Sequence, residues 1–201
     1  MLSIDYSKYD AFIFDMDGTL VDSMPAHLAA WEQALLKQQL PVHIGFVAER
    51  GGMPTLKIAE QYQQQFGVDI DGPRLLKDKR AGFDALWQKV DRIDASCQLL
   101  SKFASSKKFG LGTGAERINM QRIMTNLNLA GYFQVMVCAE DVKAHKPEPD
   151  TFLSVAKGLA VPPERCLVFE DTPFGLKAAH NAGMDCVMVH NMQLAEFLAV
   201  N

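Results

Sequence analysis

The feature that most constrains this chain is a short apolar stretch that leads directly into two aspartates. Residues 11–14 read Ala-Phe-Ile-Phe, and they are followed by Asp15, Met16, Asp17 and Gly18. An apolar stretch of this length beside a glycine is typical of a strand buried on both faces of a parallel sheet. Open α/β sheets bind ligands at the carboxyl ends of their strands, so the two carboxylates lie at a predicted binding edge. Because neighbouring carboxylates repel each other, the site needs a bound cation, a shared proton or both.

Composition and charge narrow the class of protein. The chain has 201 residues, 48% of them hydrophobic, and a net charge of −4, which suits one domain with an insertion or two small domains. An acidic chain of this kind does not favour a nucleic acid or an anionic membrane as a partner. Residues 1–10 lack the apolar segment of a signal peptide, no apolar run approaches a membrane span, and the four cysteines lack metal-type spacing. We therefore expect a cytoplasmic protein.

The hydrophobic pattern changes along the chain and predicts two regions. Residues 22–94 show helical patterning without a convincing strand, whereas strands and helices alternate from residue 95 onward. Alternation of this kind predicts parallel strands joined by crossover helices. We therefore predict a doubly wound α/β core of residues 1–21 and 95–201, interrupted by a helical insertion of residues 22–94.

The individual elements can be placed approximately. Helices are predicted at residues 26–36, 53–66, 75–90, 96–104, 116–127, 149–157 and 174–181, and strands at residues 109–112, 135–138, 166–169 and 186–189. Near the C-terminus, Leu194, Phe197 and Leu198 have helical spacing. We expect them to pack one last helix on the core.

Polar side chains that could take part in catalysis or ligand binding follow four of the predicted strands. After the aspartates come Thr113 in a Gly-Thr-Gly turn, Lys146 in a Lys-Pro-Glu-Pro segment, and the acidic pair Glu170-Asp171. Each segment alone has an ordinary explanation as a loop or turn, and the acidic pair could cap the following helix. All four appear in order after strands, however, and in a doubly wound sheet such loops converge on one edge.

The chemistry of these groups points to a metal and a phosphate. Several carboxylates beside one lysine require a cation, and a donor set made only of oxygen favours Mg²⁺. Thr113 can offer a hydroxyl to an anion, its loop can offer backbone N–H groups, and Lys146 adds a positive charge. A carboxylate in this setting is available to attack phosphorus.

These motifs identify a resemblance that covers essentially the whole chain. The sequence resembles the haloacid dehalogenase superfamily, in particular its β-phosphoglucomutase-like subgroup, and it is most similar to the sugar-phosphate phosphatases there. The resemblance implies a Rossmann-like core with an inserted all-helical cap, an aspartyl-phosphate intermediate and a Mg²⁺ cofactor. Asp15 would be the nucleophile and Asp17 the general acid and base.

The resemblance also implies how the phosphoryl group and the metal are held. Thr113, Gly114 and Lys146 would bind the phosphoryl group. Mg²⁺ would be bound by the side chain of Asp15 and the backbone carbonyl of Asp17, together with Asp171 and, directly or nearby, Glu170. The implied ligand is a small sugar monophosphate, for example a 1-phosphate or 6-phosphate of glucose or fructose.

Within the predicted cap, four residues are candidates for contacting the substrate. His27 stands where similar proteins carry a histidine that lines the site. Gly51 belongs to a Gly-Gly loop through which the backbone could approach a ligand. Arg50 and Lys79 could bind a hydroxyl or carboxylate group, although each, like the histidine, could equally be an ordinary surface residue.

Two departures from the β-phosphoglucomutase pattern favour hydrolysis. A mutase carries an arginine shortly after its cap glycine, whereas this chain has Met53-Pro54-Thr55, and Gly18-Thr19 after Asp17 is common among the hydrolases. We therefore predict a phosphatase, with a β-phosphoglucomutase as the first alternative. A non-catalytic protein that binds a phosphorylated ligand is the second alternative, and a metal-independent dehalogenase is the least favoured. A monomer is expected.

Overall fold

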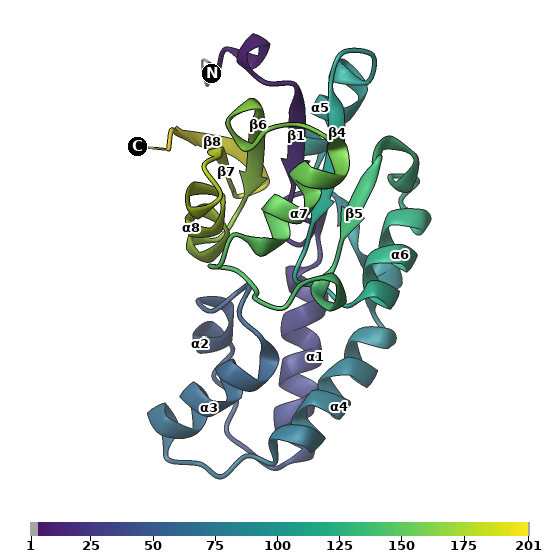
Figure 1. The fold of residues 1–201 in the computed structure, drawn as a ribbon. Helices are drawn as coiled ribbons and strands as arrows, with labels where there is room; N and C mark the ends of the chain where they lie inside the picture. Colours follow the sequence, from purple (N-terminus) through teal and green to yellow (C-terminus); the bar gives the residue numbers. More distant parts are fainter. Residues whose placement is uncertain (1–3, 201) are drawn as a thin grey trace. The chain divides into compact units, whose positions relative to one another are not determined.

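The computed structural model describes residues 4–200, which divide by their internal contacts into two compact units (Figure 1). The larger unit joins the chain up to Asp22 with the chain from Asp91 onward. The smaller unit is the continuous segment Ser23–Val90.

The larger unit is built on a six-stranded sheet whose strand order is β5-β4-β1-β6-β7-β8. Its strands are β1 (Ala11–Phe14), β4 (Lys108–Gly112), β5 (Val135–Val137), β6 (Cys166–Glu170), β7 (Asp185–His190) and β8 (Gln193–Leu198). The first five of these are parallel to one another, and only β8 runs antiparallel, beside β7. The predicted doubly wound, parallel α/β sheet is confirmed. A separate two-stranded pair joins β2 (Val21–Asp22) to β3 (Asp91–Arg92).

The central position of β1 follows from its sequence. All four of its residues are fully buried, because helices cover the sheet on both sides and leave no face for polar side chains. Phe14 pairs with Leu111 of β4 and with Phe169 of β6. This register brings the carboxyl ends of the three strands level with one another, so Asp15 lies beside the residues that end β4 and β6.

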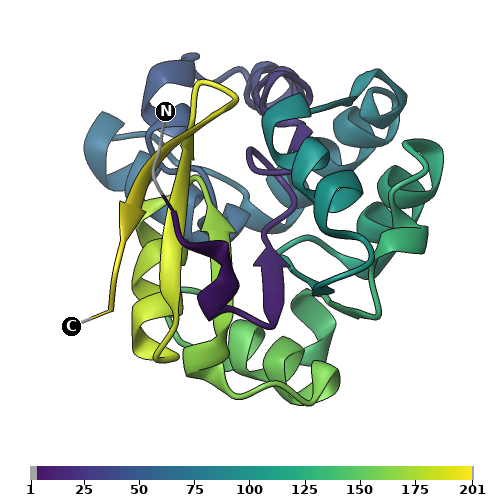
Figure 2. The same ribbon diagram turned by 90° about the horizontal axis from the view of Figure 1, so that it is seen from above.

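Helices cover the two faces of the sheet with different side chains. On one face, α7 (Asp150–Leu159) and α8 (Pro173–Asn181) pack on Ile13 and Val168 in a mainly aliphatic core; both helices lie along the same side of the strands in Figure 2. On the other face, Phe103 at the end of α5 (Asp94–Phe103) packs edge-on against Phe12 at 5.2 Å between ring centroids. The remaining long helix of this unit is α6 (Arg117–Asn126).

The C-terminal segment forms a strand, so the prediction of a last helix was wrong. Figure 2 shows β7 and β8 side by side at the edge of the sheet. Asn191 and Met192 join them with φ angles of 48° and 60°, the conformation of a type I′ hairpin turn. In the ladder Leu194 faces Val189 and Glu196 faces Met188, which leaves Ala195 as the extra residue of a bulge. The bulge interrupts the alternation of residues between the two faces of the strand. Leu194, Phe197 and Leu198 therefore have the spacing of a helix in the sequence.

The smaller unit contains α1 (Met24–Lys37), α2 (Ile44–Ala48), α3 (Thr55–Phe66) and α4 (Gly72–Asp84). Its core gathers buried residues from these helices, among them Trp31, Leu35, Tyr62 and Leu75. The helix predicted to extend from residue 75 to residue 90 begins earlier and ends at Asp84, and a 3₁₀ turn (Trp87–Lys89) follows it. The short helix α2 has too few residues to show a period and was not predicted.

Within residues 4–200, no helix combines the length and the apolar character that crossing a bilayer requires.

Candidate active site

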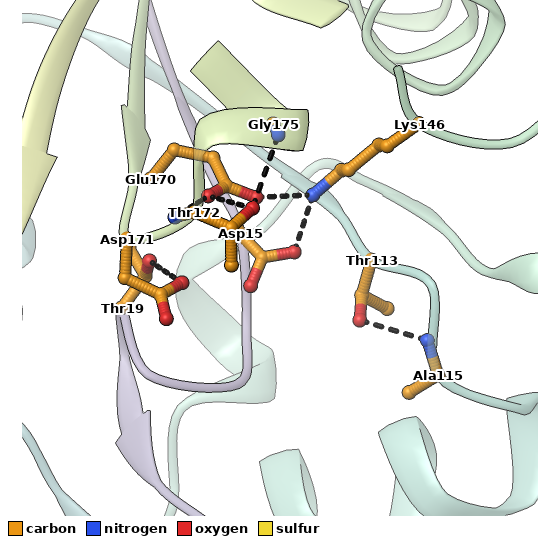
Figure 3. Close-up of polar contacts among 9 residues, drawn as sticks. All are labelled: Asp15, Thr19, Thr113, Ala115, Lys146, Glu170, Asp171, Thr172 and Gly175. Atoms are coloured by element: carbon orange, nitrogen blue, oxygen red, sulfur yellow. Dashed lines mark hydrogen bonds and ion pairs between the residues drawn. The ribbon is translucent and has the colours of Figure 1, made fainter. Parts of the chain in front are cut away.

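The centre of the candidate site is Lys146, whose ammonium group bridges two buried carboxylates. Its Nζ atom donates to Asp15 Oδ1 at 2.5 Å and to Glu170 Oε1 at 2.9 Å (Figure 3). The two acids are 6% and 2% exposed, respectively. Lys146 follows β5 in the chain, Asp15 follows β1 and Glu170 ends β6. The structure therefore brings together groups from three of the four predicted segments.

Glu170 is fixed by the loop that begins α8. Its Oε2 atom accepts hydrogen bonds from the backbone N–H of Thr172 at 2.5 Å and from the Thr172 hydroxyl at 3.0 Å. The Thr172 hydroxyl also accepts from the N–H of Gly175 at 3.0 Å and so caps the helix. The acidic pair therefore does not itself cap α8. Thr172 is the cap residue, and Glu170 fixes Thr172 in position.

Asp171, the first residue after β6, is placed by the loop that follows β1. The Thr19 hydroxyl donates to Asp171 Oδ1 at 3.2 Å, and Thr19 is fully buried. Gly18 has a φ of +81°, and a Cβ atom there would lie 2.2 Å from Asp171 Oδ2. This position therefore requires glycine both for its backbone conformation and for the close approach of the carboxylate.

The carboxylates form a set that suits a divalent cation. Asp15, Glu170 and Asp171 can each direct one oxygen so that all three atoms lie within 4.8 Å of one another. Burial raises the pKa of the Asp15 carboxyl well above its usual range, although the charge of Lys146 partly opposes this. Burial and then the charge of Glu170 raise the pKa of Asp171 to about 7. The negative charge of these carboxylates exceeds the single positive charge of Lys146, so the site needs further positive charge. The available ligands are hard oxygen donors, which Mg²⁺ prefers.

Protein stability should therefore fall with rising pH when divalent metal is removed. The pKa of Asp171 rises from an ordinary 3.8 to about 7 on folding, so between these values the folded state holds a proton that the unfolded chain has released. Under that condition the free energy of unfolding decreases as pH rises. We expect urea unfolding in EDTA to show a loss on the order of 2 kcal/mol from about pH 5 to about pH 8.

Two comparisons check the origin of this loss. Asp171→Asn should flatten the pH dependence in EDTA, and Mg²⁺ should diminish it in the unsubstituted protein because the bound ion replaces the proton. A stability in EDTA that rises over the same interval would contradict the assignment.

Thr113, Gly114 and Asp17 complete the residues predicted for the core. In the view of Figure 3 the Asp15 carboxylate lies between Asp171 on one side and Thr113 on the other. The Thr113 hydroxyl oxygen accepts from the Ala115 N–H at 3.0 Å and still has its own proton to donate. A Cβ atom at Gly114 would meet nothing within 4 Å. Asp17 is half-buried, and its charge contributes to the raised pKa of Asp15.

In the smaller unit, His27 of α1 and Lys79 of α4 contact each other. The Lys79 ammonium lies 3.2 Å from His27 Nδ1, and the His27 ring stacks on Phe83 at 4.2 Å between centroids. Because an ammonium group can only donate, Nδ1 is the acceptor in this contact.

The other two predicted residues of this unit have separate surroundings. The Arg50 guanidinium lies 3.4 Å from the centre of the Phe46 ring and donates to Gln61 Oε1 at 2.8 Å. Gly51 lies in the turn after α2, where a Cβ atom would make only ordinary contacts, the nearest being the Ala48 carbonyl at 3.5 Å. Contacts of all four residues with a substrate stay predictions.

Several residues that shape the site were not predicted from the sequence. Thr172 could have been found, since a threonine before a proline is a strong signal for the start of a helix. Gly18 and Gly175 act by lacking a side chain, and the sequence does not show which carboxylate approaches them. Thr19 gives no local signal of its contact with Asp171 across the chain.

Comparison with known proteins supports the same family. Residues 12–189 match the model of the family described as haloacid dehalogenase-like hydrolase. The chain is 36% identical to "Fructose-1-phosphate phosphatase YqaB" of Escherichia coli (strain K12) over 92% of this chain and 98% of the relative. It is 31% identical to "Phosphorylated carbohydrates phosphatase" of Thermotoga maritima over 91% and 87%. Among solved structures, β-phosphoglucomutase from Clostridium difficile has a TM-score of 0.78 and 27% identity, covering 91% of this chain and 85% of that one.

The protein belongs to the haloacid dehalogenase-like hydrolases, as its motifs predicted. The expected enzyme class, a phosphoric monoester hydrolase, is likewise confirmed by its relatives.

Proposed function

We propose that this protein is a Mg²⁺-dependent phosphatase that hydrolyses small sugar monophosphates, such as fructose 1-phosphate, through a phosphorylated Asp15. The observation that carries the proposal is the bridge from Lys146 to Asp15 and Glu170 beside Asp171. This arrangement supports the proposal because it would supply a nucleophile, a fixed cation and oxygens for a metal at one sheet edge. The relatives named for acting on fructose 1-phosphate and on phosphorylated carbohydrates support the substrate class.

In the proposed reaction, Asp15 attacks the phosphoryl group in line with the departing sugar oxygen. Lys146 already holds Asp15 Oδ1, so it orients the carboxylate and brings positive charge to the phosphoryl oxygens. The Thr113 hydroxyl and the backbone N–H of Gly114 bind the same oxygens. Mg²⁺, held by Asp15, Asp171, the Asp17 carbonyl and, directly or through water, Glu170, would add positive charge that neutralises the developing negative charge.

Asp17 moves the protons. In the first half of the reaction its carboxylic acid protonates the sugar oxygen as the P–O bond to the sugar breaks. In the second half its carboxylate takes a proton from the water that attacks the aspartyl phosphate. This exchange regenerates the Asp15 carboxylate and releases inorganic phosphate.

The smaller unit is proposed to select the substrate. His27 and Lys79, which already contact each other, are the foremost candidates to bind sugar hydroxyl or phosphate oxygens, with Arg50 and Gly51 as further candidates. We also propose a monomeric, cytoplasmic enzyme. The burial of Cys138, Cys166 and Cys186, which pack in the core as small hydrophobic residues, supports reduced thiols and hence a reducing location.

The test is phosphate release from a panel of hexose monophosphates, each assayed with Mg²⁺ and with EDTA. We expect release that requires Mg²⁺ and is fastest with one or a few members of the panel, including fructose 1-phosphate. If the folded protein released no phosphate, the phosphatase would be excluded. Formation of glucose 6-phosphate from β-glucose 1-phosphate with added bisphosphate would then assign a mutase, and failure of both assays would favour a non-catalytic binding protein.

A further inference from the structure

Lys146 has a third partner that carries no charge. The ring of Phe152, in the first turn of α7, has its centroid 4.6 Å from Lys146 Nζ, and Phe152 is fully buried. Aromatic rings attract cations at distances of up to about 6 Å because the face of the ring is electron-rich. We infer that Phe152 is a positioning residue that holds the Lys146 ammonium in place through this attraction; the inference rests on the proposed phosphatase function.

Two glycines on β4 allow α7 and the Phe152 ring to pack closely against this strand. A Cβ atom on Gly112 of β4 would lie 3.1 Å from both Phe152 Cδ1 and Thr151 Cγ2. A Cβ atom on Gly110 would lie 2.1 Å from Val155 Cγ1, so a larger residue there would push α7 outward. Gly110 precedes the Gly-Thr-Gly turn and Gly112 is its first residue, and their contacts explain both glycines by packing rather than by phosphate binding. They fix the helix, and hence the ring, against the sheet.

Phosphoryl transfer changes the charged groups around Lys146 but leaves the Phe152 ring unchanged. When an Asp15 carboxylate oxygen forms its bond to phosphorus and the bond from phosphorus to the sugar oxygen breaks, Asp15 becomes an acyl phosphate and loses its carboxylate charge. One of the two anionic contacts of Lys146 thus changes in every turnover, from the Asp15 carboxylate to the phosphoryl oxygens of the intermediate. The attraction of the Phe152 ring does not depend on that charge. It therefore keeps the ammonium in position both before and after phosphoryl transfer.

Fluorination of the ring separates this role from simple core packing. Fluorine withdraws electrons from the ring face while changing the shape of the side chain little, whereas Phe152→Leu could fail to fold. We would replace Phe152 with mono-, di- and trifluorophenylalanine by site-specific incorporation and measure kcat and KM for the best substrate of the panel. We expect log kcat/KM to fall stepwise with each fluorine, to a loss of roughly tenfold, chiefly in kcat.

The matched control is the same series at Phe109, a buried ring on β4 that packs among Phe12, Phe14 and Phe133. It should leave kcat/KM unchanged while altering the core to a similar extent. A flat series at Phe152, with phosphate release intact in the unsubstituted protein, would overturn the inference and leave the proposed function standing. Absence of release from the unsubstituted protein would remove both.

Discussion

Asp15→Asn should abolish Mg²⁺-dependent phosphate release, with a loss of roughly 10⁴-fold or more in kcat. The amide has nearly the shape of the carboxylate but lacks the charge and the nucleophilic oxygen that would attack phosphorus. The variant should nevertheless fold. The penalty for burying a charged carboxylate disappears, and Lys146 keeps its contact with Glu170. Initial rates under saturating Mg²⁺ and melting curves in EDTA measure the two expectations.

The matched control is Asp10→Asn, the same chemical change at an exposed carboxylate just before β1. Asp10 pairs with Arg165 at 2.7 Å, and the loss of such an exposed pair has little effect on stability. We expect wild-type phosphate release from this variant. If Asp15→Asn also kept wild-type release, the assignment of the nucleophile would be wrong.

Gly175→Ala should lower kcat/KM by roughly 10²-fold or more, although alanine is favoured over glycine inside a helix by about 1 kcal/mol. Gly175 lies in the first turn of α8, where the new Cβ atom would lie 1.9 Å from Glu170 Cδ and 2.0 Å from Glu170 Oε1. Figure 3 shows Gly175 directly beside this carboxylate. Glu170 would have to move away, and Lys146 would lose one of its two anionic partners. The clash should therefore outweigh the gain in helix propensity, and stability should also fall.

Gly131→Ala serves as the control because a Cβ atom at Gly131 meets nothing within 4 Å. Gly131 lies in a 3₁₀ turn (Ala130–Tyr132), away from the described site residues in the chain. Kinetic constants and unfolding curves of both variants would be compared with those of the unsubstituted protein. Wild-type activity in Gly175→Ala would show that the position of Glu170 is not critical to the reaction.

The parts of the fold that could be predicted from the sequence are those whose burial leaves a local pattern. Strand β1 shows a continuous apolar run because both of its faces are covered, and the loops after β1, β4 and β6 could then be assigned to one edge. Strand β8 was predicted as a helix because its bulge at Ala195 replaced the alternation of apolar and polar residues with helix-like spacing. Its pairing with β7 depends on a two-residue turn at Asn191 and Met192, and methionine is an unusual residue at a positive φ.

For the candidate site, the sequence indicated which side chains carry charge but not which neighbouring residues fix those side chains in position. Lys146 and Asp15 could be placed in one crevice from topology alone. The contact of Glu170 with Thr172, the approach of Gly175 and the ring of Phe152 depend on side-chain directions and helix packing. Residues that act by being small, or by presenting the face of a ring, leave no pattern along the chain that distinguishes them from ordinary core positions.

The interruption of the larger unit by the smaller one has a consequence during synthesis on the ribosome. Strand β1 is made well before its two neighbours in the sheet, which pair with it only from Lys108 and Cys166 onward. The segment Ser23–Val90 is complete long before that point, whereas the four apolar residues of β1 stay without their sheet partners. Nascent chains that stop before β6 therefore expose an aggregation-prone strand. They also lack Glu170 and α8, so Asp15 gains its full set of neighbours only after β6 and α8 have been made.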